Sequence, residues 1–129
     1  MSPRTKAKDG SWLYPTTRWA IYLRDGLACV YCGITLDEVL ADDGSNFLSV
    51  DHVRARCRGG TREPTNLVTC CYDCNVIKST LSLKAFCFKQ GFTYERVRSR
   101  IRKRRVRDIE RYRESAKILL GLTNWAPLN

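Results

Sequence analysis

The sequence contains little imidazole and no long apolar segment. Its 129 residues include one histidine and one methionine. Apolar runs are short and interrupted by charge, and the basic N-terminus has no apolar stretch. These absences argue against a membrane span and a secretory signal, so we expect a cytoplasmic protein with no membrane contact. At 43% hydrophobic residues, a chain of this length is about the size of one domain.

Positive charge is in excess and unevenly distributed. The net charge is +10, and residues 93–129 hold 11 Lys or Arg against 4 Asp or Glu. Such an excess favours polyanionic partners and says nothing about the fold. We therefore expect a domain over residues 1–92 with a basic N-terminal tail. Residues 93–129 then form a basic helical extension, packed on that domain or extending from it.

The cysteine pattern predicts a metal site. Seven is an odd number, and without a secretory signal a disulfide framework is the weaker explanation. Two CxxC turns can together present four thiolates to one structural zinc, which would also add folding energy to a small core. These pairs are Cys29 with Cys32 and Cys71 with Cys74. The other three complete no such spacing and are expected to be small buried side chains: Cys57, Cys70 and Cys87.

The periodicity predicts a mixture of helices and strands. A helix is expected from Pro15 to Gly26, and an exposed acidic loop over residues 36–46. Residues 47–55 predict a strand with Leu48, Val50 and His52 on one face. An extended piece precedes the second CxxC pair, which begins a helix. Further helices are expected over residues 82–91, with Ser82 as N-cap, and from residue 93 to about 120.

Polar residues of a distinct chemistry lie between the cysteine pairs. His52 directly follows Asp51, and Asn66, Asn75 and Lys78 come after it. A lone strand histidine is more often a packing residue, but its neutral ring can take a proton from water. Carboxylate and amide oxygens suit Mg²⁺ or Mn²⁺ better than zinc. Because adjacent strand residues point to opposite faces, Asp51 and His52 can act together only if the strand end bends or twists.

Taken in order, these motifs strongly resemble the HNH endonuclease family, the ββα-metal or His-Me finger nucleases. The pieces "RDGLACVYCG" and "VDHVRARCRGGTREPTNLVTCCYDCNVIKS" carry the resemblance, which spans roughly residues 18–80. They are similar to a cysteine-bearing subgroup with asparagine, here Asn75, at the third motif position. The resemblance implies an α+β fold, a small ββα-metal core with a structural four-cysteine zinc site and flanking helices.

The resemblance also implies roles for individual residues. His52 is expected to act as general base for hydrolysis of a DNA phosphodiester bond, and Asn66 to pin the loop that orients it. Asp51 and Asn75 are expected to hold catalytic Mg²⁺ or Mn²⁺, which stabilises the leaving group.

Basic residues are expected to bind DNA through phosphates, with low sequence specificity. Those near the site are Arg54, Arg56, Arg58, Arg62 and Lys78, and those in the C-terminal segment are Arg102, Lys103, Arg104 and Arg105. Solvated charge is the alternative explanation for any one of them. The C-terminal helix could instead dock on a protein partner. The chain as a whole could also be a zinc-stabilised DNA-binding or accessory module of a phage packaging or restriction complex with weak or no catalysis. RNA as ligand and the oligomeric state are left open.

Overall fold

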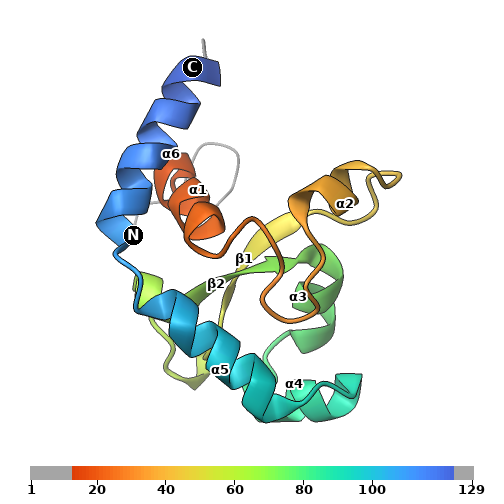
Figure 1. Ribbon diagram of the computed structural model, residues 1–129. Coiled ribbons are helices and arrows are strands. Elements are labelled where there is room, and N and C mark those ends of the chain that lie inside the picture. Colours follow the sequence, from red (N-terminus) through yellow and green to blue (C-terminus); the bar gives the residue numbers. More distant parts are fainter. Residues whose placement is uncertain (1–12, 124–129) are drawn as a thin grey trace.

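A computed structural model describes residues 13–123, which form a small α+β structure. Within these residues, six α-helices and two short 3₁₀ helices surround a two-stranded antiparallel sheet (Figure 1). In chain order, the elements are α1 (Pro15–Arg24), α2 (Leu36–Leu40), β1 (Leu48–His52), η1 (Arg56–Arg58), η2 (Pro64–Asn66), β2 (Leu67–Cys71), α3 (Tyr72–Lys78), α4 (Leu83–Gln90), α5 (Tyr94–Arg105) and α6 (Ile109–Thr123). Residues 1–12, where the basic N-terminal tail is predicted, and residues 124–129 of the predicted C-terminal extension lie outside the described residues.

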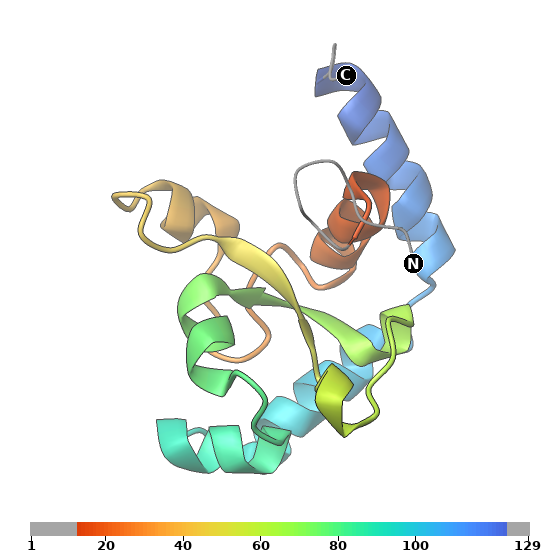
Figure 2. The same cartoon turned by 180° about the vertical axis from the view of Figure 1, so that it is seen from behind.

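The sheet and α3 form the predicted ββα unit. β1 and β2 are antiparallel, with Leu48 opposite Cys71 and His52 opposite Leu67. α3 follows β2 directly, because the Cys71 side chain caps the helix by accepting a hydrogen bond from the backbone N–H of Cys74. α3 contacts both strands (Figure 2). The last residues of β1 therefore lie beside α3.

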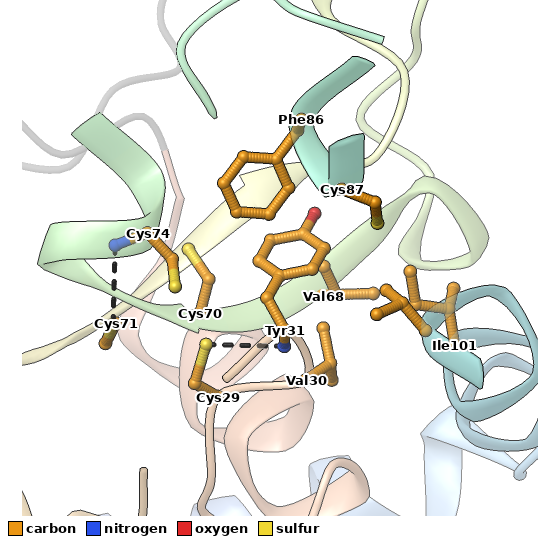
Figure 3. Packing of buried hydrophobic residues seen from close by; sticks show 11 residues of the cluster. Cys29, Val30, Tyr31, Val68, Cys70, Cys71, Cys74, Phe86, Cys87 and Ile101 are labelled. Atoms are coloured by element: carbon orange, nitrogen blue, oxygen red, sulfur yellow. Dashed lines mark hydrogen bonds between the residues drawn. The ribbon is translucent and has the colours of Figure 1, made fainter. Parts of the chain in front are cut away.

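Two apolar clusters stabilise the unit from opposite sides. The first contains three of the four CxxC cysteines, Cys29, Cys71 and Cys74, together with Tyr31, Phe86 and other buried apolar residues (Figure 3). Tyr31 and Phe86 meet edge to face, with ring centroids 5.1 Å apart. The second joins α1 to the sheet through Ile21, Val50 and Leu67. Leu48 also packs against this second cluster.

A buried ion pair attaches the end of α1 to β2. Arg24 and Asp25 are 1% and 0% exposed, and Arg24 Nε lies 2.8 Å from Asp25 Oδ1. Arg24 also donates to the carbonyls of Pro64 and Leu67, and Asp25 accepts from the backbone N–H of Thr69. Each charge thus has a partner and additional hydrogen bonds, as burial requires.

The segment expected to be an acidic loop contains a short helix instead. The prediction was wrong for α2, because a capping box begins a helix there. Glu38 N–H donates to Thr35 Oγ1 at 3.2 Å, and Thr35 N–H donates to the Glu38 carboxylate at 2.8 Å. Within α2, the side chain of Val39 is buried.

The C-terminal segment also differs from the expected single helix. Helix α5 ends at Arg105 and α6 begins at Ile109, where the apolar stripe is interrupted by arginines. Ile101 packs in the first cluster, whereas Ile109 packs against the second. One straight helix could not reach both, so the chain turns and α6 lies beside α1 (Figures 1 and 2). The predicted division at residues 92 and 93 stays a prediction.

The helices of residues 13–123 are short or strongly charged. None of them combines the length and apolar composition needed to cross a bilayer.

Candidate functional site

The four CxxC cysteines converge on one point. Their Sγ atoms all lie within 4.8 Å of one another, and those of Cys32 and Cys71 are 3.8 Å apart. A tetrahedral zinc with bonds of about 2.3 Å places its sulfurs about 3.8 Å apart. The turn after α1, the end of β2 and the first turn of α3 supply the ligands. The cluster therefore has the chemistry and spacing of a structural zinc site.

Backbone hydrogen bonds hold these sulfurs in place. The N–H of Tyr31 donates to Cys29 Sγ and that of Cys74 donates to Cys71 Sγ, each at 3.4 Å (Figure 3). The N–H of Cys32 also donates to Cys29 Sγ at 3.4 Å. Hydrogen bonding to Cys29 lowers the pKa of Cys32 to about 7 and also lowers the pKa of Cys71. The thiols of Cys29 and Cys74 accordingly have raised pKa values, because they donate within the cluster. Lowered thiol pKa values favour the thiolate form, which is the form that binds a metal.

The remaining cysteines lie apart from this cluster of ligands. Cys70 and Cys87 are buried, as predicted, and burial raises the pKa of each thiol. For Cys57 the prediction of burial was wrong, because η1 lies at the surface and exposes the side chain.

Asp51 lies in a buried polar contact between β1, α3 and the CxxC turn. It is 6% exposed, and its Oδ2 accepts a hydrogen bond from Tyr31 Oη at 2.6 Å. The same oxygen lies 3.0 Å from Lys78 Nζ, which also donates to the carbonyl of His52 at 3.0 Å. Lys78 is fully buried. Its ammonium therefore holds the end of β1, a different placement from the predicted contact with nucleic acid.

Asn75 faces the same surface of β1 as Asp51. Its Nδ2 donates to Ser49 Oγ at 3.2 Å. Ser49 and Asp51 are two residues apart on a strand and so share a face, while Asn75 and Lys78 are one helical turn apart on α3. Both contacts of the Asp51 carboxylate fall on Oδ2, and Asn75 donates through Nδ2, so Oδ1 of Asp51 and the side-chain amide oxygen Oδ1 of Asn75 are the oxygens that could bind a cation. This donor set fits a hard ion such as Mg²⁺ or Mn²⁺.

His52 ends β1 and directly follows Asp51 in the chain. Its side chain is half-buried and its Nε2 atom is buried. Burial lowers the pKa of His52 below its usual value, and the charges of Arg56, Lys78 and Arg62 act in the same direction against Asp51. The ring is therefore neutral at physiological pH, the form that can accept a proton.

Asn66 links the strand end to the loop that follows. Its Oδ1 accepts from the backbone N–H of Arg54 at 3.0 Å, and its Nδ2 donates to the carbonyls of Arg54 and Thr61 at 3.1 and 2.8 Å. The backbone carbonyl of Asn66 also accepts a hydrogen bond from Val53 N–H at 2.8 Å. The side chain and backbone of one residue thus fix the chain directly after His52.

Substitution of Asn66 by alanine is expected to lower the free energy of unfolding by about 1–3 kcal/mol, because three side-chain hydrogen bonds are lost. Urea denaturation measures this loss. Asn66→Asp is the matched comparison, since its carboxylate can still accept from Arg54 N–H but cannot donate to the two carbonyls. Equal stability of wild type and Asn66→Ala would show that the side chain does not hold the loop.

The predicted basic residues are placed in different ways. Arg56 and Arg62 are exposed, and Arg54 and Arg58 flank the Gly59–Gly60 turn. Arg102 and Lys103 are exposed on α5, whereas Arg104 donates to the carbonyl of Asp25 and Arg105 to that of Thr65.

Two residues of the site were missed by sequence reasoning. Tyr31 lies inside the first CxxC turn, and its hydroxyl reaches Asp51. Ser49 lies two residues before Asp51 and contacts Asn75. The strand alternation carried a signal for Ser49, because it places this residue on the face of Asp51. No local sequence pattern indicated a role for Tyr31, because the CxxC motif around it is already explained by metal binding.

Residues 29–81 match the model of the HNH endonuclease family. The matched segment contains both CxxC pairs and the residues from Asp51 to Lys78, and it ends before α4. No curated protein and no solved structure is significantly similar to the chain.

Proposed function

We propose that this chain is a metal-dependent endonuclease that hydrolyses DNA phosphodiester bonds, with the HNH segment at residues 29–81 as its catalytic unit. One observation carries the proposal. A neutral histidine at the end of β1 lies next to a buried carboxylate, and an amide on α3 faces the same strand. The residues proposed as base and as oxygen ligands for a cation thus belong to one ββα unit.

His52 acts as the general base. Because burial keeps its ring neutral, the imidazole has a lone pair for a proton. The ring takes that proton from a water molecule as the water attacks phosphorus. Asn66 fixes the backbone of the following residues, and Lys78 holds the carbonyl of His52. These contacts keep the ring at a constant position relative to the strand being cut.

Asp51 and Asn75 would hold the catalytic cation. Mg²⁺ or Mn²⁺ bound there would supply positive charge that stabilises the leaving 3′ oxygen. Tyr31 orients the Asp51 carboxylate through Oδ2. The soft thiolate cluster and the hard oxygen site therefore serve different ions, zinc for structure and Mg²⁺ or Mn²⁺ for the reaction.

A zinc-stabilised DNA-binding module without catalysis is the second candidate. The ion pair between Asp51 and Lys78 favours it, because an ammonium already neutralises the carboxylate. In the binding module, the Lys78 ammonium takes the place of the divalent cation. In the endonuclease, the cation binds Asp51 beside Lys78.

Cleavage of supercoiled plasmid separates the two candidates. Purified protein loaded with zinc is incubated with plasmid and Mg²⁺, Mn²⁺, Ca²⁺ or no added divalent ion. We expect nicked or linear product with Mg²⁺ or Mn²⁺ and none without a divalent ion. Binding of the plasmid without cleavage under every condition would contradict the endonuclease and support the binding module.

DNA binding itself is expected to weaken steeply with salt. If about four phosphates are contacted, raising salt from about 50 to 200 mM lowers the association constant roughly 100-fold. Fluorescence anisotropy of a labelled duplex without divalent ions measures this. An association constant that does not change with salt would contradict phosphate contacts by the exposed arginines.

A further inference from the structure

A cavity lies between the loop after His52 and helix α5. Its volume is about 390 Å³, within the range of small-ligand sites. Val53, Arg54 and Arg58 line one wall, and Tyr94, Arg98 and Arg105 line the other. The α5 residues are spaced by four and seven positions, which places them on one face of the helix. Since α5 lies outside the matched HNH segment, this cavity is a feature of the whole chain.

The cavity concentrates positive charge. Four arginines line it, and none of the described lining residues is acidic: Arg54, Arg58, Arg98 and Arg105. Arg98 has an acidic neighbour in Glu95, but this exposed pair spans 3.7 Å. An exposed pair of this kind contributes little. Four guanidinium groups around one cavity therefore favour an anion, and arginine suits phosphate through its several N–H donors.

Three of these arginines are held in place by the backbone. Arg54 Nε donates to the carbonyl of Arg58 at 2.7 Å, and Arg58 Nε donates to that of Thr80 at 2.8 Å. Arg105 Nη1 donates to the carbonyl of Thr65 at 2.8 Å. Each guanidinium has five N–H donors, so the others remain for a ligand. Holding the side chains in advance lowers the entropy cost of binding.

The Gly59–Gly60 turn fixes the loop that carries two of them. Gly59 has φ +90°, and a Cβ on Gly60 would lie 1.7 Å from the carbonyl oxygen of Arg54. Only glycine permits this approach. The turn therefore brings Arg54 and Arg58 to the same wall.

The cavity also has an apolar part, which a phosphate alone would not use. Leu83, Ile101 and the aromatic residue Tyr94 line it together with the arginines. Nucleic-acid bases stack on aromatic side chains, whereas a duplex is too wide to enter a space of this size. We propose that the cavity binds one unpaired nucleotide, with its phosphate on the arginines and its base against Tyr94.

The nucleotide belongs to the strand that is cut. Val53 and Arg54, which line the cavity, directly follow His52 in the chain, so the cavity adjoins the residue proposed to activate water. That assignment rests on the proposed endonuclease function, while the binding of a nucleotide does not. The cavity would favour substrates with a frayed or single-stranded segment beside the cut.

Calorimetry with small probes tests the binding. The zinc-loaded full chain is titrated without Mg²⁺ or Mn²⁺ with 2′-deoxyadenosine 5′-monophosphate (dAMP) and with inorganic phosphate. We expect one site that binds the nucleotide about 10-fold more tightly than phosphate, because stacking adds to the ionic contacts. Equal affinities would overturn the base site, and no binding of either would overturn the whole proposal.

Three variants locate the site. Arg98→Gln is expected to weaken dAMP binding about 10-fold by removing charge-assisted hydrogen bonds. Arg96→Gln on the same helix, exposed and outside the cavity, is the matched control and should leave dAMP binding unchanged. Tyr94→Leu should abolish the preference for dAMP over phosphate. An equal loss of dAMP affinity in the two arginine variants would mean that dAMP is attracted by the overall positive charge of α5. That result would overturn the assignment of the site to this cavity.

Competition distinguishes a strand from a free nucleotide. A ten-nucleotide single strand should displace dAMP, and a blunt duplex of the same sequence should do so at least about 10-fold less well. Failure of the single strand to compete would overturn the strand assignment and leave a site for free nucleotides. Equal competition by the duplex would overturn the unpaired base. Plasmid cleavage is measured separately, so failure of the cavity and failure of the endonuclease give different results.

Discussion

Replacement of His52 by alanine is expected to lower the rate of cleavage by about 10²- to 10⁴-fold, the usual contribution of a general base. The side chain is half-buried at the end of β1 and is not a member of either apolar cluster. Folding and DNA binding should therefore persist. Single-turnover cleavage of plasmid measures the loss of rate. Thermal melting measures whether the variant is folded, and fluorescence anisotropy measures whether it still binds DNA.

Arg56→Gln is the matched control for this experiment. Arg56 is exposed near the histidine, and its charge contributes to the lowered pKa of His52. Its removal tests whether a change of local charge alone abolishes cleavage, and we expect a far smaller loss than for His52→Ala. Cleavage by His52→Ala at the wild-type rate would contradict the role of the imidazole.

Replacement of Cys71 by serine is expected to have the largest effect on stability. Cys71 joins β2 to α3 and contributes one of four sulfurs that lie within 4.8 Å of one another. Structural zinc contributes about 10–16 kcal/mol of apparent binding free energy in zinc-finger peptides, which is comparable with the total stability of a typical domain. Loss of one ligand should therefore remove the cooperative thermal transition and the bound zinc.

Two other cysteines serve as controls for Cys71→Ser. Cys57→Ser changes an exposed thiol and should leave both melting temperature and zinc content unchanged. Cys70→Ser places a hydroxyl at the adjacent buried position. It measures the cost of a buried cysteine-to-serine change when no zinc ligand is lost. Identical melting temperatures for wild type and Cys71→Ser would contradict a structural metal.

The elements around the motifs could be predicted from local signals. Pro15 begins α1, and Gly26 with φ +79° follows its end. Ser82 caps α4 and Gly91 follows it, as expected. The spacing of the CxxC pairs predicted the cluster of sulfurs, because ligand geometry is set within each turn. Signals of this kind depend on a few neighbouring residues and survive in any tertiary context.

The remaining features depend on tertiary contacts. Lys78 had the sequence of a helix-surface lysine, but its ammonium is buried against Asp51. The break between α5 and α6 follows from two separate packing surfaces, which periodicity along one segment does not show. Arg98 meets the loop after His52 only because α5 folds back over it. Pairings across long stretches of chain are not encoded in local sequence patterns.

Binding of Mn²⁺, followed by electron paramagnetic resonance, tests the separation of base and cation site most directly. The zinc-loaded chain is titrated with Mn²⁺ in the presence of a short duplex with a non-hydrolysable phosphate linkage. We predict one bound ion in wild type and in His52→Ala, and a large loss of affinity in Asn75→Ala. Loss of the ion in His52→Ala but not in Asn75→Ala would contradict the account, because it would make the imidazole the ligand.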